Sequence, residues 1–191
     1  MNYMKISKTD IANGEGIRCV LWVSGCSVHC KGCHNPETWD FNAGRTFGPE
    51  AMEELISALK KPWVKGLTIS GGNPLDYENL PDVYNICKAV RELCPDKDIW
   101  LYSGYELKAH DFDSSVNIGW SNALLMNYIL AMCDVVVDGP YVEELRDISL
   151  RFRGSSNQRL IDDKRTIKTG EIVLWGDVTN VCSTTYSARD A

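Results

Sequence analysis

The chain has 191 residues, of which 44% are hydrophobic, and a formal net charge of −6. The length suits a single domain with a sizeable core, and the negative charge provides no basic surface for nucleic acid or an anionic membrane. No apolar run approaches the roughly 18 residues that span a bilayer. The N-terminal sequence MNYMKISKTD lacks the apolar core of a secretion signal, so we expect a cytoplasmic protein.

In the first part of the chain, short apolar runs alternate with helical patterns. Residues 17–23 read as a buried strand that leads directly into a loop rich in cysteine. A helix begins at Pro49, because apolar residues recur there at offsets i, i+3, i+4 and i+7. The inward residues of this helix are Met52, Leu55, Ile56 and Leu59. A second strand is expected at 67–70, where Gly71 and Gly72 end it.

The same alternation continues to residue 139. Pro81 opens a second helix, and its expected inward residues are Val83, Ile86, Cys87, Val90 and Leu93. A strand at 99–102 and a connecting loop at 111–121 follow. The third helix is expected at 122–132, with Leu125, Tyr128, Ile129 and Met132 on its apolar side. A strand at 135–137 ends at Asp138 and Gly139, and a last strand is expected at 172–175.

Repeated strand–loop–helix units predict an α/β fold with a parallel sheet. A closed eight-unit barrel needs about 250 residues, so we expect a partial, open parallel β/α barrel. We assign residues 1–182 to one domain and 183–191 to a loose tail. The polar and glycine-rich clusters all follow predicted strands, and the carboxyl ends of parallel strands are where such folds place their chemistry.

The loop after the first strand carries Cys26, Cys30 and Cys33 in the spacing C-x3-C-x2-C. A 4Fe–4S cluster usually takes one thiolate at each of its four irons. Three local thiolates would leave one iron open, and an open metal position can activate a substrate or cofactor. The alternative is a structural zinc site in which His29 or His34 completes the ligand set.

The other five cysteines are Cys19, Cys87, Cys94, Cys133 and Cys182. Eight cysteines make up about 4% of the chain, below the roughly 8–10% of a disulfide scaffold. Cys19, Cys87 and Cys133 fall in apolar periodic segments, so we interpret them as small buried hydrophobic residues.

Two further features have both a structural and a functional interpretation. Gly71 and Gly72 are compatible with an ordinary turn, or with close approach of the backbone to a ligand. In the second case a side chain at Gly72 would fill space that the ligand needs. The segment 151–168 carries six basic residues, which form either a solvated face or a docking surface for a protein.

Several motifs together resemble one family. CSVHCKGCHNPETW, LTISGGNPL and FRGSSNQR are similar to motifs of radical S-adenosylmethionine (SAM) enzymes, specifically the activating proteins of anaerobic (class III) ribonucleoside-triphosphate reductases. The resemblance runs from Met1 to about Asp162, and FRGSSNQR is its most discriminating part, because other radical SAM enzymes do not share it.

The resemblance implies that Cys26, Cys30 and Cys33 hold a 4Fe–4S cluster whose fourth iron is chelated by SAM. It implies that Gly32, Cys33 and His34 contact SAM and that Gly72 contacts its methionine portion. We add Gly71, Asn73, Ser103 and Asp138 to the cofactor-binding residues, because they stand at the ends of predicted strands. No acid–base residue is expected, because cofactors of this kind carry the chemistry themselves.

The implied reaction needs two protein partners. A reduced flavodoxin-like donor would supply an electron, and reductive cleavage of SAM would yield methionine and a 5′-deoxyadenosyl radical. That radical would take a hydrogen atom from a glycine in a loop of the large reductase subunit. Other hypotheses are a different small radical SAM enzyme and a zinc-stabilised binding module without catalysis.

The chain differs from the family pattern at three places. His34 stands where the family often has an aromatic residue, and Asn13-Gly14-Glu15-Gly16 replaces the sequence NGPG. Asn73 follows the glycine pair, where the family usually has Asp or Glu. None of these differences removes a cysteine of the loop.

Overall fold

A computed structural model describes residues 1–113 and 122–176. Its strands form one open sheet in the order β3-β1-β2-β4-β5-β6-β7. Their bounds are β1 Asn2–Asp10, β2 Arg18–Val23, β3 Arg45–Thr46, β4 Gly66–Gly71, β5 Asp98–Tyr102, β6 Val135–Asp138 and β7 Arg159–Asp162. The central strands β2, β4, β5 and β6 are parallel, whereas β1, β3 and β7 pair antiparallel with their neighbours.

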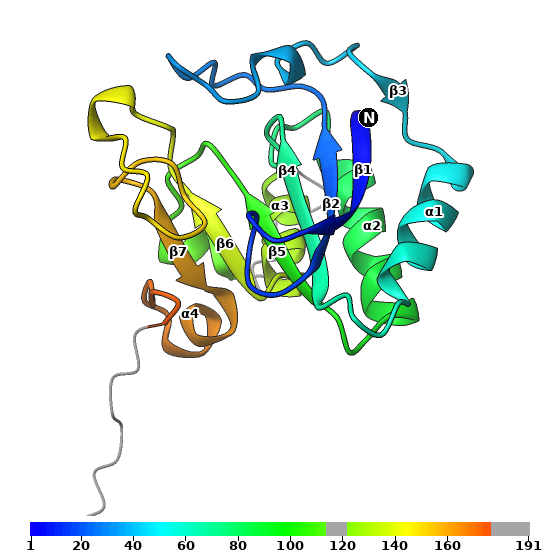
Figure 1. Cartoon of the computed structure of the whole chain (residues 1–191). Coiled ribbons are helices and arrows are strands. Elements are labelled where there is room, and N and C mark those ends of the chain that lie inside the picture. The colour runs from blue at the N-terminus through cyan, green and yellow to red at the C-terminus, as the bar shows by residue number, and fades with distance from the viewer. Residues whose placement is uncertain (114–121, 177–191) are drawn as a thin grey trace, which may run out of the picture.

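Helices follow the parallel strands. The α-helices are α1 Pro49–Leu59, α2 Leu80–Leu93, α3 Asn122–Met132 and α4 Asp163–Thr169, and 3-10 turns occupy η1 Pro36–Thr38, η2 Ala109–Phe112 and η3 Glu143–Leu145. Helices α1, α2 and α3 cover one face of the sheet and lie behind or beside it in Figure 1. The connections between neighbouring parallel strands are right-handed, and strands added in one direction along the sheet therefore place their helices on the same face.

The strands divide their residues between the two faces of the sheet. Leu67 and Ile69 of β4 belong to the large core between sheet and helices, and Ile99 and Leu101 of β5 join them. The alternate residues of β5, Trp100 and Tyr102, belong to a smaller apolar cluster on the opposite face. Successive side chains in a strand point to opposite sides, so the same strands build a dry core on one face and a second surface on the other.

The predicted elements up to β6 agree closely with the structure, since each expected strand and helix is present within a residue or two. The inward faces of the helices agree less well. Leu93 is 53% exposed and Tyr128 is 38% exposed, while Leu124 and Asn127 are buried on α3. α3 is apolar nearly all round, so its sequence could not indicate which side would face the sheet.

The expected parallel sheet is confirmed for the central strands, but the strands on both sides of them run antiparallel. The chain forms a mixed seven-stranded sheet, because β1, β3 and β7 run antiparallel. The strand expected at 172–175 is a single antiparallel bridge between Leu174 and Ile161. The proposed tail 183–191, residues 114–121 of the predicted loop and Cys182 lie outside the described residues.

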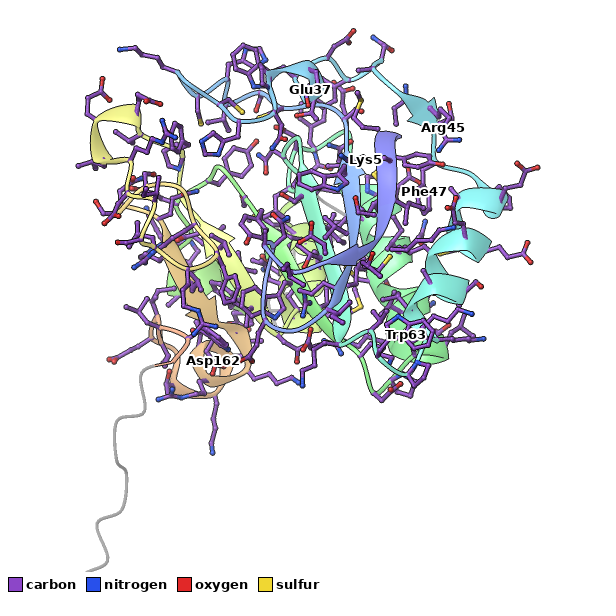
Figure 2. The ribbon with its side chains drawn as sticks, in the orientation of Figure 1. Lys5, Glu37, Arg45, Phe47, Trp63 and Asp162 are labelled. Carbon is purple, nitrogen blue, oxygen red and sulfur yellow. The ribbon has the colours of Figure 1, made fainter. Side chains whose placement is uncertain are left out.

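The two ends of the sheet are distinguishable in Figure 2. Glu37 of η1 is labelled at the end where the parallel strands finish, and Trp63 and Asp162 are labelled at the opposite end. Beside β1, Arg45 and Phe47 flank the ring of Tyr3, with the Phe47 and Tyr3 ring centroids 5.5 Å apart. No helix in the described ranges is both long enough and apolar enough to cross a bilayer.

Candidate functional site

A cavity of about 340 Å³ lies at the carboxyl ends of the parallel strands. Its wall includes eight of the predicted site residues: Cys26, Cys30, Cys33, His34, Gly71, Gly72, Asn73 and Ser103. Residues from the C-terminal part of the chain, among them Tyr141, Phe152 and Arg153, form the remaining side. The fold therefore brings together segments that are more than 100 residues apart in the sequence.

The three cysteines stand in a loop that extends directly from β2. The beginning of this loop is fixed by backbone hydrogen bonds, in which Gly25 donates to Thr38 at 2.8 Å and Cys26 donates to Trp39 at 3.1 Å. Asp76, which is 1% exposed, holds the next residue of the loop. Its carboxylate accepts the backbone N–H of Ser27 at 2.9 Å and the Ser27 hydroxyl at 2.6 Å.

All three loop cysteines are free thiols and partly buried, and all three line the cavity. Burial raises the pKa of the Cys26 thiol, although the backbone N–H groups of His29 and Val28 favour its thiolate. The backbone N–H of Asn35 points to Cys33 Sγ at 3.4 Å. Among residues 1–113 and 122–176, no three His, Cys, Asp or Glu side chains are grouped closely enough to hold one metal ion.

Gly71 and Gly72 lie where the end of β4 meets the cysteine loop. Gly71 has φ +104°, in the region that favours glycine. A β-carbon at Gly72 would lie 2.4 Å from the backbone oxygen of Gly25. The backbone oxygen of Gly25 accepts the backbone N–H of Asn73 at 2.8 Å. The backbone at Gly72 therefore lies close to the backbone of the cysteine loop, and a residue with a side chain at this position would clash with that loop.

Asn73 and Ser103 lie side by side in the cavity wall. The Ser103 hydroxyl donates to Asn73 Oδ1 at 3.2 Å and accepts the backbone N–H of Tyr105 at 3.1 Å. The backbone N–H of Leu75 also donates to Asn73 Oδ1, at 3.3 Å. Both side chains are buried, so this part of the wall has a fixed polar pattern.

His34 and Gly32 are two residues apart in the sequence but lie differently with respect to the cavity. His34 lines the cavity, and its ring centroid lies 4.9 Å from that of Tyr141. Gly32 is exposed and is not part of the cavity wall. A β-carbon on Gly32 would meet the Glu143 carboxylate at 2.3 Å, so Gly32 lies against the η3 segment.

Asp138 also lies outside the cavity wall. Its carboxylate is fully buried, accepts the backbone N–H of Leu107 at 2.8 Å and pairs with Arg159, whose Nε lies 3.0 Å from Asp138 Oδ1. These bonds connect β6, β7 and the segment after β5. The structure thus uses the Asp138 carboxylate to join these elements.

The segment FRGSSNQR forms a compact turn against the residues that follow β6. Gln158 Oε1 accepts the backbone N–H of Gly154 at 2.9 Å, and Gln158 Nε2 donates to the carbonyl of Gly139 at 3.1 Å. Asn157 donates to the carbonyl of Pro140 at 2.8 Å. Several basic residues of segment 151–168 are engaged within the protein, because Arg153 donates to Gln158 O and Lys164 pairs with Asp134.

Sequence reasoning missed three residues that shape the site: Asp76, Asn79 and Tyr141. Asn79 Nδ2 donates to the carbonyls of Ser24 and Asn73, at 3.1 and 3.0 Å, and so ties the cysteine loop to the loop after β4. Asp76 performs a similar task through Ser27. Ser27 and Ser24 stand about 50 residues before Asp76 and Asn79, and His34 stands more than 100 residues before Tyr141, so no local spacing could have indicated these contacts.

Comparisons with known proteins agree with these features. A family model described as "4Fe-4S single cluster domain" matches residues 12–161. The anaerobic ribonucleoside-triphosphate reductase-activating protein of Haemophilus influenzae is 41% identical over 160 residues, covering 83% of this chain and 96% of that protein. The Escherichia coli K12 protein of the same name is 40% identical with the same coverage. The phage T4 protein of that name is 38% identical, covering 84% of this chain and 93% of that protein.

The matched description names an iron–sulfur cluster, which favours the cluster over the zinc alternative for the loop cysteines. The identities exceed a third of the aligned residues and extend over nearly the full length of the relatives. The chain belongs to the 4Fe-4S family of anaerobic ribonucleoside-triphosphate reductase-activating proteins.

Proposed function

We propose that the protein is a radical SAM activating enzyme that generates a glycyl radical on an anaerobic ribonucleoside-triphosphate reductase. The observation that carries the proposal is the meeting of three free, partly buried cysteines with a glycine-rich strand end around one cavity. Membership of the family of activating proteins supports the reaction class and the reductase as partner, and we propose its large subunit as the substrate. We further propose that the open sheet is a partial barrel of the radical SAM type.

The donor set fits a 4Fe–4S cluster with one iron left for SAM. Cys26, Cys30 and Cys33 would each hold one iron, and the cavity that they line provides room beside the fourth. When bound, the cluster and SAM would supply the radical chemistry: one electron from a reduced flavodoxin-like donor would cleave SAM into methionine and a carbon radical, which would take a hydrogen atom from a glycine of the reductase. We place the protein in the cytoplasm, because its reducing conditions keep cysteine thiols free to hold a cluster.

The residues of the chain contribute position and polarity. Asp76 and Asn79 hold the cysteine loop against the loop after β4, which fixes where the cluster would stand. Backbone N–H groups from Val28, His29 and Asn35 face cysteine sulfurs, and such hydrogen bonds stabilise sulfur ligands. Gly71, Gly72, Asn73, Ser103 and His34 form the wall that SAM would contact.

Gly32 and Asp138 would have supporting roles and no direct contact with SAM. Because both lie outside the cavity wall, they would act on SAM only through the segments they support. Gly32 permits the loop to lie against Glu143, and Asp138 ties β6 to β7.

The decisive experiment uses anaerobically purified full-length protein with its cluster loaded. The protein is incubated with reductant, SAM and the candidate reductase subunit, and electron paramagnetic resonance follows the partner. A glycyl doublet on the reductase is the expected result. SAM cleavage without any radical on the reductase would instead indicate another substrate for the same chemistry. Failure of the purified protein to take up iron and inorganic sulfide during loading would contradict the proposal as a whole.

A further inference from the structure

The amide of Asn73 has an orientation that the surrounding backbone determines. Asn73 is 1% exposed, and its Oδ1 accepts the backbone N–H of Leu75 at 3.3 Å. A backbone N–H can only donate, so the atom that faces it must be the oxygen of the amide. The Ser103 hydroxyl donates to the same oxygen, while its own oxygen accepts the N–H of Tyr105. The Nδ2 group is therefore directed away from Leu75 and Ser103.

This Nδ2 group has no hydrogen-bond partner within the described residues, although it is buried. Leaving a buried donor unpaired costs free energy, and such a group in a native protein calls for an explanation. Asn73 belongs to the wall of the cavity, next to Gly72. A ligand in the cavity would satisfy the donor if it presents an acceptor oxygen at this point.

Apart from the three cysteine thiolates, which the cluster would engage, the side chains of the cavity wall favour an anionic group over a cationic one. The wall residues that the structure describes include no Asp or Glu, and Arg153 is the only Arg or Lys among them. Asp76 lies close by but uses its carboxylate for Ser27 and for the hydroxyl of Tyr105, the latter at 2.6 Å. An ammonium group would meet no free carboxylate on this wall, whereas a carboxylate would meet an amide donor.

We infer that Asn73 Nδ2 donates a hydrogen bond to the carboxylate of the methionine portion of SAM, and that Ser103 positions the amide for this contact. An Asp or Glu at this place, as is usual in the family, could only accept from the amino group when ionised. Asn73 thus makes the glycine-rich strand end of this chain a carboxylate-binding element. The inference rests on the proposed function, because SAM is the ligand of that site.

The test is the sign of the change in SAM affinity for Asn73→Asp. The variant is isosteric, and its oxygens can still accept from Leu75 and Ser103, so the local fold is retained. Anaerobically reconstituted full-length protein is equilibrated with labelled SAM in the absence of reductant, so that binding is measured without turnover. We expect Asn73→Asp to weaken SAM binding by about tenfold or more, because a charge-assisted hydrogen bond becomes a repulsion. Equal or tighter binding would overturn the inference, since an ammonium contact predicts that direction.

Two further variants keep the outcome interpretable. Asn73→Ala removes the donor without adding charge, and we expect SAM affinity to fall about fivefold. Unchanged affinity in this variant overturns the inference even if Asn73→Asp loses its cluster. Ala12→Asp adds the same charge elsewhere on the cavity wall, at an exposed residue, and a loss of affinity equal to that of Asn73→Asp would assign the effect to general charge.

Ser103→Ala tests the positioning role. We expect a smaller loss of SAM affinity than for Asn73→Ala, and no additional loss when the two changes are combined, because Ser103 acts through the amide. Additive losses would overturn the positioning role. Iron and sulfide contents are compared in every variant. Wild-type protein that holds its cluster and yet binds no SAM would refute the proposed function, whereas normal binding with the wrong sign refutes the Asn73 contact alone.

Discussion

The cysteines of the loop after β2 and those of the core between sheet and helices differ in where the fold places them. Cys26, Cys30 and Cys33 lie partly buried in a loop that lines the cavity, whereas Cys19 and Cys87 are fully buried between the sheet and the helices. In the core, burial raises the pKa of Cys19 to about 12, so its thiol stays protonated. The comparison teaches that chemistry in this fold depends on which end and which face of a strand a side chain occupies, and that a thiol in the core behaves as a small apolar group.

The sharpest way to test this comparison is to remove one cysteine from each region. We expect Cys30→Ala to lose the cluster and all SAM cleavage, because two thiolates of the loop cannot hold three irons. Cys87→Ala is the matched control and should keep the cluster, with a loss of stability of about 1 kcal/mol from the small cavity. Iron, sulfide and SAM cleavage are measured for both. Normal cleavage in Cys30→Ala would remove that residue from the ligand set.

A second large effect is expected for Gly72→Val. The new β-carbon would meet the backbone oxygen of Gly25 at 2.4 Å, and a backbone atom cannot move aside as a flexible side chain can. We therefore expect both lower cluster content and weaker SAM binding. The sequence analysis expected a side chain at Gly72 to fill space that SAM needs, and the structure adds a clash with the cysteine loop. Full cluster content with weakened SAM binding would show that the side chain disturbs SAM and leaves the cysteine loop in place.

A smaller effect is expected for Asp76→Ala, which frees the cysteine loop without touching a cysteine. The change removes the acceptor for both polar groups of Ser27 and for the hydroxyl of Tyr105. We expect the free energy of unfolding to fall by about 2–3 kcal/mol and the cluster to be lost faster to a chelator. Asp96→Ala is the control, because Asp96 is 72% exposed and should change stability little. Equal chelation rates in both variants would show that Asp76 does not hold the loop.

The smallest expected change is in the free energy of unfolding when the buried residue Asp163 is replaced. Burial, with the Asp134 carboxylate as a second cause, raises the pKa of Asp163 well above its usual value. A carboxyl with a raised folded pKa binds its proton more tightly when folded, so its cost is absent below about pH 4 and grows as the pH rises. We expect Asp163→Asn to increase stability at pH 7 by about 1–2 kcal/mol and to leave it unchanged near pH 3. Thermal melts at both pH values check this, and equal melting temperatures at pH 7 would contradict it.

Sequence patterns predicted the middle of the fold well because local periodicity determines it. The segment from β2 to β6 consists of βα units whose apolar faces repeat at 3.6 or 2 residues, and the structure places each of them close to the expected bounds. The antiparallel strands β1 and β7 lack such a pattern. β1 is mostly half-buried or exposed, and β7 has only two buried residues, so pairing with neighbours stabilises them more than local preference does.

The candidate site was predictable where its residues follow one another in the chain. The cysteine spacing and the Gly71-Gly72-Asn73 run could be located from sequence, and both line the cavity. What holds them could not be predicted, since Asp76 and Asn79 act on a loop about 50 residues earlier. The orientation of the Asn73 amide likewise depends on its hydrogen bonds with Leu75 and Ser103. Only the fold shows which atom of the amide remains unpaired.

The division of each strand between the two faces has a consequence for insertions and deletions. In β4, Thr68 and Ser70 alternate with the core residues Leu67 and Ile69, and Ser70 lines the cavity. One residue added inside β4 would exchange the two sets, turning hydroxyl groups into the core and leucine or isoleucine toward the cavity. Two added residues would restore the order. Natural length variation in this part of the protein should therefore be confined to the loops, or occur within the strands only in pairs.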